Sequence, residues 1–303
     1  SVSLSKKSEV MNLQAGTLYI VGTPIGNLED TSFRAVRILQ TVNLIAAEDT
    51  RHTAKLLQHF AISTPQVSYY EHNTRSRIPV ILDKLGQGQS IALVTDAGVP
   101  GISDPGSELV QICVEKEINV VPIPGPSAVV TALSASGLST ERFVFEGFLP
   151  TKPQARRARL EALAAEPRTI VLYESPHRLC QTLAALSTSL GDERPLVLAR
   201  ELTKLHESFW RGSLASAIAH YSVHQPQGEF TLVIDGASIS EPILSEAALK
   251  AELENLLQQG LSRSQASRQL AQQTALTRRQ IYQLALTIGA PSAPSAISPV
   301  VEP

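Results

Sequence analysis

Short apolar runs alternate with segments of helical periodicity between residues 18 and 234, and this alternation limits the fold more than any other feature of the chain. Each apolar run can form one buried strand, and each helical segment can cross over to a parallel neighbour, so the pattern predicts an α/β architecture. Between the first two runs, Phe33, Val36 and Leu39 fall on one helical face. The predicted strands are Leu18–Val21, Leu44–Ala47, Ile91–Thr95, Val120–Ile123, Phe143–Phe145, Thr169–Tyr173, Leu196–Ala199, Ser208–Arg211 and Phe230–Ile234.

The spacing of these elements predicts two successive α/β domains and a smaller helical unit. In the last part of the chain, leucines recur at helical spacing from Leu249 to Leu257. Ser262–Gln265 and Thr277–Gln280 each have the form of a capping box, which predicts two more short helices in a helix-turn-helix-like unit. The predicted divisions are a flexible lead at 1–14, α/β domains at 15–126 and 127–238, the helical unit at 239–290 and a disordered tail at 291–303.

Composition excludes several classes of protein. The 26 Lys and Arg residues nearly balance the 28 Asp and Glu residues, which argues against a surface that is basic throughout. We expect the two cysteines to be buried free thiols. The cysteines and the seven histidines show no metal-ligand spacing, so no metal is expected. No apolar run approaches the roughly 18 residues of a membrane span, and the first residues lack an apolar signal core. These features predict a cytoplasmic protein that does not enter a membrane.

The helical unit is the one part with a marked charge bias. It carries Arg263, Arg268, Arg278 and Arg279, and residues 256–300 contain no Asp or Glu. Such a face can be an ordinary solvated helical surface, or it can bind the phosphates of RNA. The absence of acidic residues favours the RNA interpretation, and DNA reading is a weaker use of the same geometry.

Three Gly- and Pro-rich turns follow predicted strands and are the strongest local signals. The first is 22–27 (GTPIGN), the second is 95–106 (TDAGVPGISDPG) and the third is 122–128 (PIPGPSA). Loops at the carboxyl ends of sheet strands are where open α/β folds bind ligands, and glycines let the backbone approach a ligand closely. The first turn alone is equally compatible with a tight structural turn. The second turn contains more glycine and proline than a simple connection between two elements requires. We therefore expect it to bind a polar cofactor.

Acidic residues at two strand ends are candidates for chemistry. Glu48 and Asp49 end a predicted strand, and Arg51 follows them. In one interpretation Asp49 caps the next helix while Glu48 pairs with Arg51; in the other, this cluster orients an acceptor or contains a general base. Glu174, at the end of another strand, is a further catalytic candidate.

Two basic residues near strand ends are candidates for phosphate binding. Arg178 suits this role because its planar guanidinium binds oxygens in pairs. Lys204 is the second candidate, although it can also form a local ion pair with Glu201.

The three turns resemble those of the tetrapyrrole methylase superfold, in which two α/β domains bind S-adenosylmethionine between them. The 95–106 segment is similar to the signature of one branch, ribosomal RNA small-subunit methyltransferase I, although Thr95 stands where that branch usually has Ser. The similarity extends over roughly residues 16–290. It includes the segments AEDTRH at 47–52, EGFLP at 146–150, YESPHR at 173–178 and ARELTK at 199–204.

The resemblance implies a homodimeric enzyme that uses S-adenosylmethionine to methylate the 2′-hydroxyl of a cytidine in the decoding region of 16S ribosomal RNA. The implied substrate is the assembled small ribosomal subunit. Methylation of a tetrapyrrole or another small molecule is the alternative within the same fold, and an RNA-binding assembly factor without catalysis is the alternative outside it. Carried over turn by turn, the implied cofactor contacts are Pro24, Ile25, Asp96, Ala97, Gly98, Val99, Ile102, Ser127, Ala128, Tyr173 and Leu202.

Overall fold

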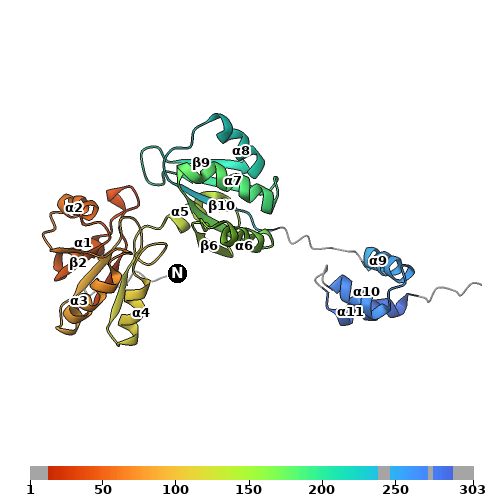
Figure 1. Cartoon of the computed structure of the whole chain (residues 1–303), viewed down its shortest axis with the longest axis horizontal. Helices are drawn as coiled ribbons and strands as arrows, with labels where there is room; N and C mark the ends of the chain where they lie inside the picture. Colours follow the sequence, from red (N-terminus) through yellow and green to blue (C-terminus); the bar gives the residue numbers. More distant parts are fainter. Residues whose placement is uncertain (1–12, 238–245, 272–275, 289–303) are drawn as a thin grey trace, which may run out of the picture. The chain divides into compact units, whose positions relative to one another are not determined.

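The computed structural model describes residues 13–237, 246–271 and 276–288 of the 303-residue chain. The chain divides into two compact units, Ser1–Ala237 and Ser238–Pro303. The first unit contains two β-sheets with their helices, and the second contains helices α9 to α11 (Figure 1). Most of the predicted lead and the whole predicted tail at 291–303 lie outside the described residues.

The first sheet is fully parallel and has the strand order β3-β2-β4-β1-β5. Alternate residues of its strands face opposite sides: Tyr19 and Val21 pack against α1 and α2, whereas Leu18 and Ile20 pack against α3 and α4. The elements are β1 (Leu18–Val21), α1 (Phe33–Thr41), β2 (Leu44–Ala47), α2 (Thr50–His59), β3 (Gln66–Ser68), α3 (Thr74–Gly86), β4 (Ile91–Val94), α4 (Ser107–Glu115) and β5 (Val120–Ile123).

The second sheet is mixed, with the order β6-β7-β10-β8-β9. Its β6 and β7 are parallel, and the remaining neighbours are antiparallel. Helices α6, α7 and α8 cover one face, and α5 packs on the other. The elements are α5 (Ala128–Ser136), β6 (Phe143–Gly147), α6 (Pro153–Ala164), β7 (Thr169–Glu174), α7 (Pro176–Leu190), β8 (Pro195–Arg200), β9 (Ser208–Ser213), α8 (Leu214–Val223) and β10 (Phe230–Ile234).

The second unit has its own small core. Helices α9 (Glu246–Gln258), α10 (Arg263–Ala271) and α11 (Arg278–Thr287) bury an apolar cluster that includes Leu253, Leu270 and Ile281. Both predicted capping boxes are present: the backbone of Gln265 binds the Ser262 hydroxyl, and the Thr277–Gln280 pair is equally reciprocal. The expected three helices are therefore confirmed.

All nine predicted strands are present, to within two residues at each end. The sequence missed β3, because this three-residue strand lies at the sheet edge, is only half-buried and has no apolar run. Of the predicted helical face, Leu39 is buried and Val36 is partly buried, but Phe33 is 97% exposed at the start of α1. Ala35 and Ile38 complete the buried side of the helix. The expectation that both cysteines are buried is wrong, since Cys180 is exposed on α7.

Two of the Gly-rich turns meet with no side chain between them. Strands β1 and β5 are neighbours, and the turns that leave them approach so closely that a Cβ on Gly22 would lie 2.7 Å from Gly125 Cα. Such a contact is far inside van der Waals distance, and both neighbours are backbone that cannot rotate away. Only glycine at both positions permits this junction.

We expect Gly22→Ala to lower the free energy of unfolding by at least about 2 kcal/mol, because the added methyl group must displace backbone. The matched control is Gly86→Ala at the end of α3, where nothing lies within 4 Å of an added Cβ. This control should leave stability unchanged or raise it by up to about 1 kcal/mol. Urea titrations of both variants test the expectation. Equal unfolding midpoints for the two variants would show that the junction can accommodate a methyl group.

Candidate functional site

The three Gly- and Pro-rich turns lie side by side, because they leave the adjacent strands β4, β1 and β5. The first and second turns are joined by a two-bond bridge: Thr23 N–H donates to Gly98 O at 2.9 Å, and Gly98 N–H donates to Thr23 O at 3.1 Å. The Thr23 hydroxyl, buried, also donates to Thr95 O at 3.0 Å. Gly98 has a φ of +86°, which lets its backbone complete this bridge.

A second pair of hydrogen bonds anchors the beginning of the 95–106 loop to the end of β2. Glu48 Oε2 accepts from Asp96 N–H at 3.2 Å, and Asp96 Oδ1 accepts from Asp49 N–H at 3.1 Å. The Glu48 carboxylate therefore binds backbone and not Arg51. This contact gives Glu48 a role in positioning the loop that the sequence did not indicate.

Asp49 and Arg51 form an ion pair with each other at the start of α2. Asp49 caps α2 by accepting from Arg51 N–H at 2.9 Å, and its other oxygen pairs with Arg51 Nη2 at 3.0 Å. Hydrogen bonds from Arg51 lower the pKa of Asp49 to about 2, and the Arg51 side chain is 90% exposed. The capping interpretation of Asp49 matches the geometry, but the predicted partner of Arg51 was wrong: it is Asp49, not Glu48.

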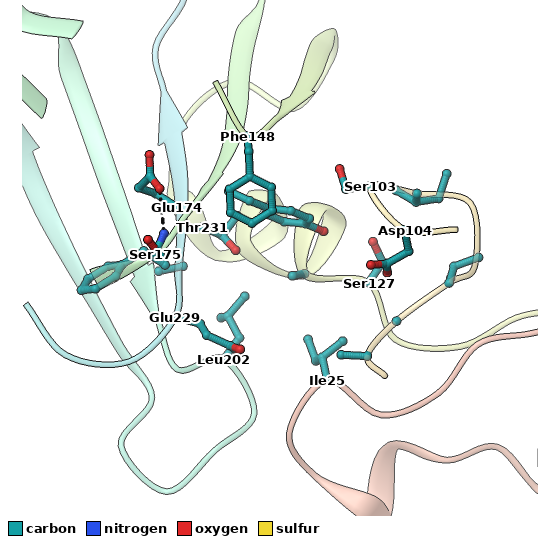
Figure 2. A pocket seen from close by; sticks show the side chains of 18 of the residues that line it. Ile25, Ser103, Asp104, Ser127, Phe148, Glu174, Ser175, Leu202, Glu229 and Thr231 are labelled. Atoms are coloured by element: carbon teal, nitrogen blue, oxygen red, sulfur yellow. Dashed lines mark hydrogen bonds between the residues drawn. The ribbon is translucent and has the colours of Figure 1, made fainter. Parts of the chain in front are cut away.

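A cavity of about 550 Å³ lies where the three turns meet the second sheet (Figure 2). Nine of the eleven predicted cofactor contacts line it; they are Ile25, Ala97, Gly98, Val99, Ile102, Ser127, Ala128, Tyr173 and Leu202. The other two, Pro24 and Asp96, are not among its lining residues, although Asp96 holds the loop behind it. The predicted residues thus come together from both sheets.

The second sheet contributes more of the wall than the sequence indicated. Lining residues that were not predicted are Ser103, Asp104, Phe148, Ser175, Pro176, Ala199, Glu229, Phe230 and Thr231. Ser103 and Asp104 belong to the second turn and were within reach of sequence reasoning. The residues of β8 and β10 were not, because an ordinary apolar strand gives no sign of which end faces a cavity.

Asp104 stands in an unusual electrostatic position. Burial, with the nearby Glu48 and Asp96 carboxylates, raises its pKa to about 6. Burial, with the negative charge of Asp104, raises the pKa of Tyr173 to about 12. The cavity therefore contains a carboxyl group that titrates near neutral pH and a phenol that stays protonated.

Glu174 lines the cavity but is held by its own surroundings. Its residue is 3% exposed, and its two oxygens accept from Ser175 N–H at 2.8 Å and from the Thr182 hydroxyl at 2.6 Å. Arg178 Nε lies 3.9 Å from it, and another nitrogen of the same guanidinium donates to Leu149 O. Both side chains thus brace the junction of β7 and α7, a geometry that assigns Glu174 a structural task.

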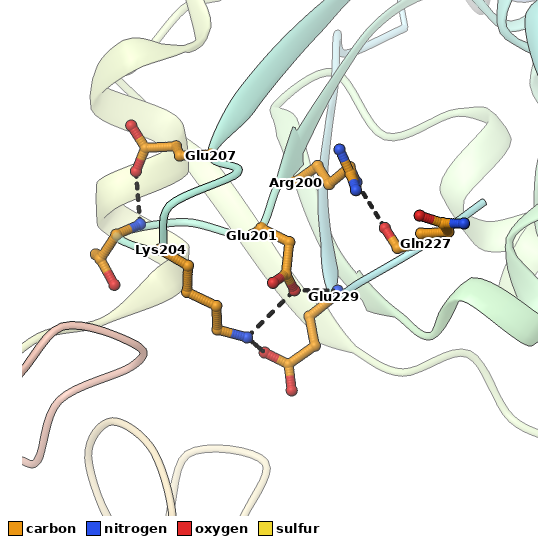
Figure 3. Close-up of polar contacts among 7 residues, drawn as sticks. Arg200, Glu201, Lys204, Glu207, Gln227 and Glu229 are labelled. Atoms are coloured by element: carbon orange, nitrogen blue, oxygen red, sulfur yellow. Dashed lines mark hydrogen bonds and ion pairs between the residues drawn. The ribbon is translucent and has the colours of Figure 1, made fainter.

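Lys204 likewise has internal partners. Its Nζ lies 3.2 Å from Glu201 and 2.9 Å from Glu229, as Figure 3 shows. This network stabilises a loop in which Glu201 and Thr203 have positive φ values of 50° and 69°. Leu202 stands between them and reaches the cavity, so the network fixes one wall of the site.

The first turn packs against the same loop. A Cβ on Gly26 would lie 2.5 Å from Lys204 Cγ and 2.8 Å from Thr203 Oγ1. A side chain at this position would have to displace Lys204 and Thr203, so Gly26 allows the first turn to pack directly on the 201–204 loop.

The four arginines of the helical unit have different surroundings. Arg263 donates to Ile288 O at 3.2 Å and is partly buried, so it stabilises the end of α11. Arg268 is exposed on α10. Arg278 and Arg279 begin α11 and, with Ser264 and Tyr282, line a shallow open hollow. The last two arginines and the free N–H groups of the helix start form the most favourable place for an anion.

The cavity suits S-adenosylmethionine on structural grounds. Its volume lies within the range of about 300–1,000 Å³ that is usual for small-molecule sites. Its lining includes the backbone of Ala97 and Val99 on either side of the Gly98 bridge, and Ser127 precedes α5 without a side-chain capping hydrogen bond. The apolar walls suit the adenosine group of such a molecule.

Residues 13–237, 246–271 and 276–288 show neither a metal-binding cluster nor a membrane-spanning helix. No group of three or more His, Cys, Asp or Glu residues is arranged to hold a metal ion there. None of the helices in those ranges combines the length and the apolar character that a membrane crossing requires.

Comparisons with known proteins agree with this geometry. The family model described as Tetrapyrrole (Corrin/Porphyrin) Methylases matches residues 17–218. Ribosomal RNA small subunit methyltransferase I from Synechocystis sp. is 60% identical over 276 residues, which cover 91% of this chain and 99% of that protein. The protein of the same name from Escherichia coli O157:H7 is 44% identical and covers 93% and 98%.

One solved structure similar to the chain is uroporphyrin-III C-methyltransferase from Thermus thermophilus complexed with S-adenyl homocysteine. It has a TM-score of 0.51 and 17% identity, and the match covers 72% of this chain and 96% of that one. At this identity the likeness concerns the fold, and it confirms the expected two-domain α/β arrangement.

The hydrogen bonds of Glu174 predict a contrast between two substitutions. Glu174→Gln keeps an acceptor for Ser175 N–H and presents an amide to Thr182, so stability should change by less than about 1 kcal/mol. Glu174→Ala leaves the buried Thr182 hydroxyl and the partly buried Ser175 N–H without their acceptor and should lower the free energy of unfolding by about 1–3 kcal/mol. Urea titrations at pH 7 measure both values, and equal losses would contradict the bracing role.

Proposed function

The chain belongs to the tetrapyrrole methylase family, in its group of ribosomal RNA small subunit methyltransferases I, and we propose that it methylates the ribose 2′-hydroxyl of a cytidine in the decoding region of 16S ribosomal RNA. The membership confirms the resemblance drawn from the three turns, and with it methyltransferase activity on ribosomal RNA with S-adenosylmethionine as donor. The observation that carries the proposal is the 60% identity to a relative whose whole length is matched. The assembled small subunit as substrate and a homodimeric enzyme are parts of the same proposal.

The proposed cofactor residues are those that line the cavity. Ile25, the backbone of Ala97–Val99, Ser127 and Ala128 would hold the cofactor from the first α/β domain and α5. Tyr173 and Leu202 would hold it from the second domain, which we place at residues 127–238 after a first domain at 15–126. Pro24 and Asp96 do not line the cavity, and Asp96 fixes the beginning of the second loop.

When bound, S-adenosylmethionine supplies a methyl group on a positively charged sulfur. The protein has to hold the acceptor oxygen in line with the bond that breaks, and positioning of this kind can contribute about 7–11 kcal/mol. The anchors at Glu48–Asp96 and Thr23–Gly98 make the second loop rigid enough for this purpose. The apolar walls exclude water and strengthen the interactions of the charges in the cavity.

The helical unit is the proposed RNA-binding element. Arg268, Arg278 and Arg279 are exposed, and Tyr282 beside the last two can stack on an unpaired base. The internal hydrogen bonds of Arg263, Arg178 and Lys204 favour structural roles for these three predicted RNA-binding residues.

The proposed reaction predicts transfer of labelled methyl groups from S-adenosylmethionine to undermethylated small ribosomal subunits. Nuclease digestion should place the label on a cytidine ribose, and free 16S RNA should accept less label than the assembled subunit. Label on a base, or transfer only to a tetrapyrrole, would contradict the proposal.

The proposed RNA contacts predict a change in salt dependence. Arg279→Ala should weaken RNA binding and reduce the slope of log K against log salt by about 0.7–0.9, the amount expected for one lost phosphate contact. Lys250→Ala is the matched control, since it removes one positive charge from the same unit but from an ion pair with Glu246. Fluorescence anisotropy over a salt series measures the slopes, and an equal change in both variants would rule out a specific contact.

A further inference from the structure

The cavity has a buried floor and an exposed mouth. Around the mouth, Ile102 is 47% exposed and Phe148 is 51% exposed. Ser103 and Asp104 follow Ile102 on the loop after β4, and Phe148 follows the end of β6 (Figure 2). Large apolar side chains that border a cavity and remain exposed are suited to cover a flat group that enters from outside. The acceptor therefore has a natural entrance at the side where Asp104 lies.

Three carboxylates line this cavity, and their surroundings separate them. Both oxygens of Glu174 accept hydrogen bonds from the protein, and its side chain is 1% exposed. Glu229 is paired with Lys204 at 2.9 Å and its side chain is 78% exposed. Among the described residues, Asp104 has no ion pair with Lys, Arg or His.

Burial and the two carboxylates that face Asp104 favour its protonation. Glu48 at the end of β2 and Asp96 after β4 bring negative charge, and the Tyr173 phenol on β7 stays protonated. The Thr95 hydroxyl is the one neighbour that stabilises the ionised form through a hydrogen bond. A carboxylate in such surroundings is a stronger base than one on the surface, and a base near neutral pH is what general-base catalysis requires.

We infer that Asp104 is the general base of the reaction, an inference that rests on the proposed function. Its carboxylate accepts the proton of the ribose 2′-hydroxyl while the oxygen forms its bond to the methyl carbon. The carbon–sulfur bond breaks in the same step, and its electron pair stays on the sulfur, which becomes neutral. The proton then leaves Asp104 for solvent, through the mouth of the cavity.

The test compares Asp104→Asn with the native protein in single-turnover methyl transfer at saturating cofactor and small subunits, from pH 5 to pH 9. In the native protein the rate should rise about tenfold per pH unit below pH 6 and level off above it, because only ionised Asp104 accepts the proton. In Asp104→Asn the rate at pH 8 should fall by about 10²–10⁴-fold. Its dependence on pH around 6 should disappear as well.

Two readouts independent of turnover accompany the rates. Calorimetry should show that Asp104→Asn binds S-adenosylhomocysteine within about threefold of the native affinity. Carbon-13 spectra of aspartate-labelled protein should contain one carboxyl resonance that titrates near pH 6 in the native protein and is missing in the variant. Glu108→Gln, which removes an exposed carboxylate four residues further along, is the control and should keep the native rate and pH profile.

The outcomes distinguish failure of the proposed function from failure of the general-base role of Asp104. Native protein that labels no ribosomal RNA ends the proposed function. If the native protein labels RNA, an Asp104→Asn variant that keeps its rate or its inflection near pH 6 overturns the inference alone. Loss of S-adenosylhomocysteine binding in this variant also overturns it, because Asp104 would then serve the cofactor and not the acceptor.

Discussion

The backbone contact between Gly22 and Gly125 governs the arrangement of the site. It brings the turns after β1 and β5 together without side chains, and the Thr23–Gly98 bridge adds the loop after β4. Three loops that are distant in sequence become one surface, because the strands that they follow are neighbours in the sheet. The cavity residues of the first α/β domain depend on this junction, so a methyl group at its centre affects stability and ligand binding together.

The wall opposite depends on charge and on strained backbone. Glu201 and Thr203 adopt conformations that non-glycine residues rarely occupy, and Lys204 compensates by pairing with two carboxylates. Leu202 is thereby placed against the ligand space, and Gly26 of the first turn packs on the same loop. The site is thus built from two rigid edges, one held by close packing and the other by an ion-pair network.

Sequence patterns were sufficient where local physics decides the outcome. Apolar runs gave the strands, glycine and proline gave the ligand-binding turns, and capping boxes gave the last two helices. They failed where a side chain's role depends on distant partners. Nothing local indicates that Glu48 accepts a hydrogen bond from Asp96 N–H, or that Arg263 bonds to the end of α11.

Asp104 lines the cavity, but the sequence did not predict it as a site residue. It stands within the 95–106 segment that was selected for its glycines and prolines, but its surroundings come from β2 and β7. A pKa raised by tertiary neighbours cannot be derived from a local pattern. The same dependence explains why Glu174, an attractive candidate at a strand end, has a structural task instead.

A crystal structure of the protein with S-adenosylhomocysteine tests the central claim most directly. The account predicts the ligand in the cavity between the turns of the first sheet and the Tyr173–Leu202 wall, against the backbone of Ala97–Val99. The sulfur should face the mouth at which Asp104 and Phe148 lie. A ligand bound elsewhere in the first unit, or a sulfur turned toward the buried Glu174, would contradict the account.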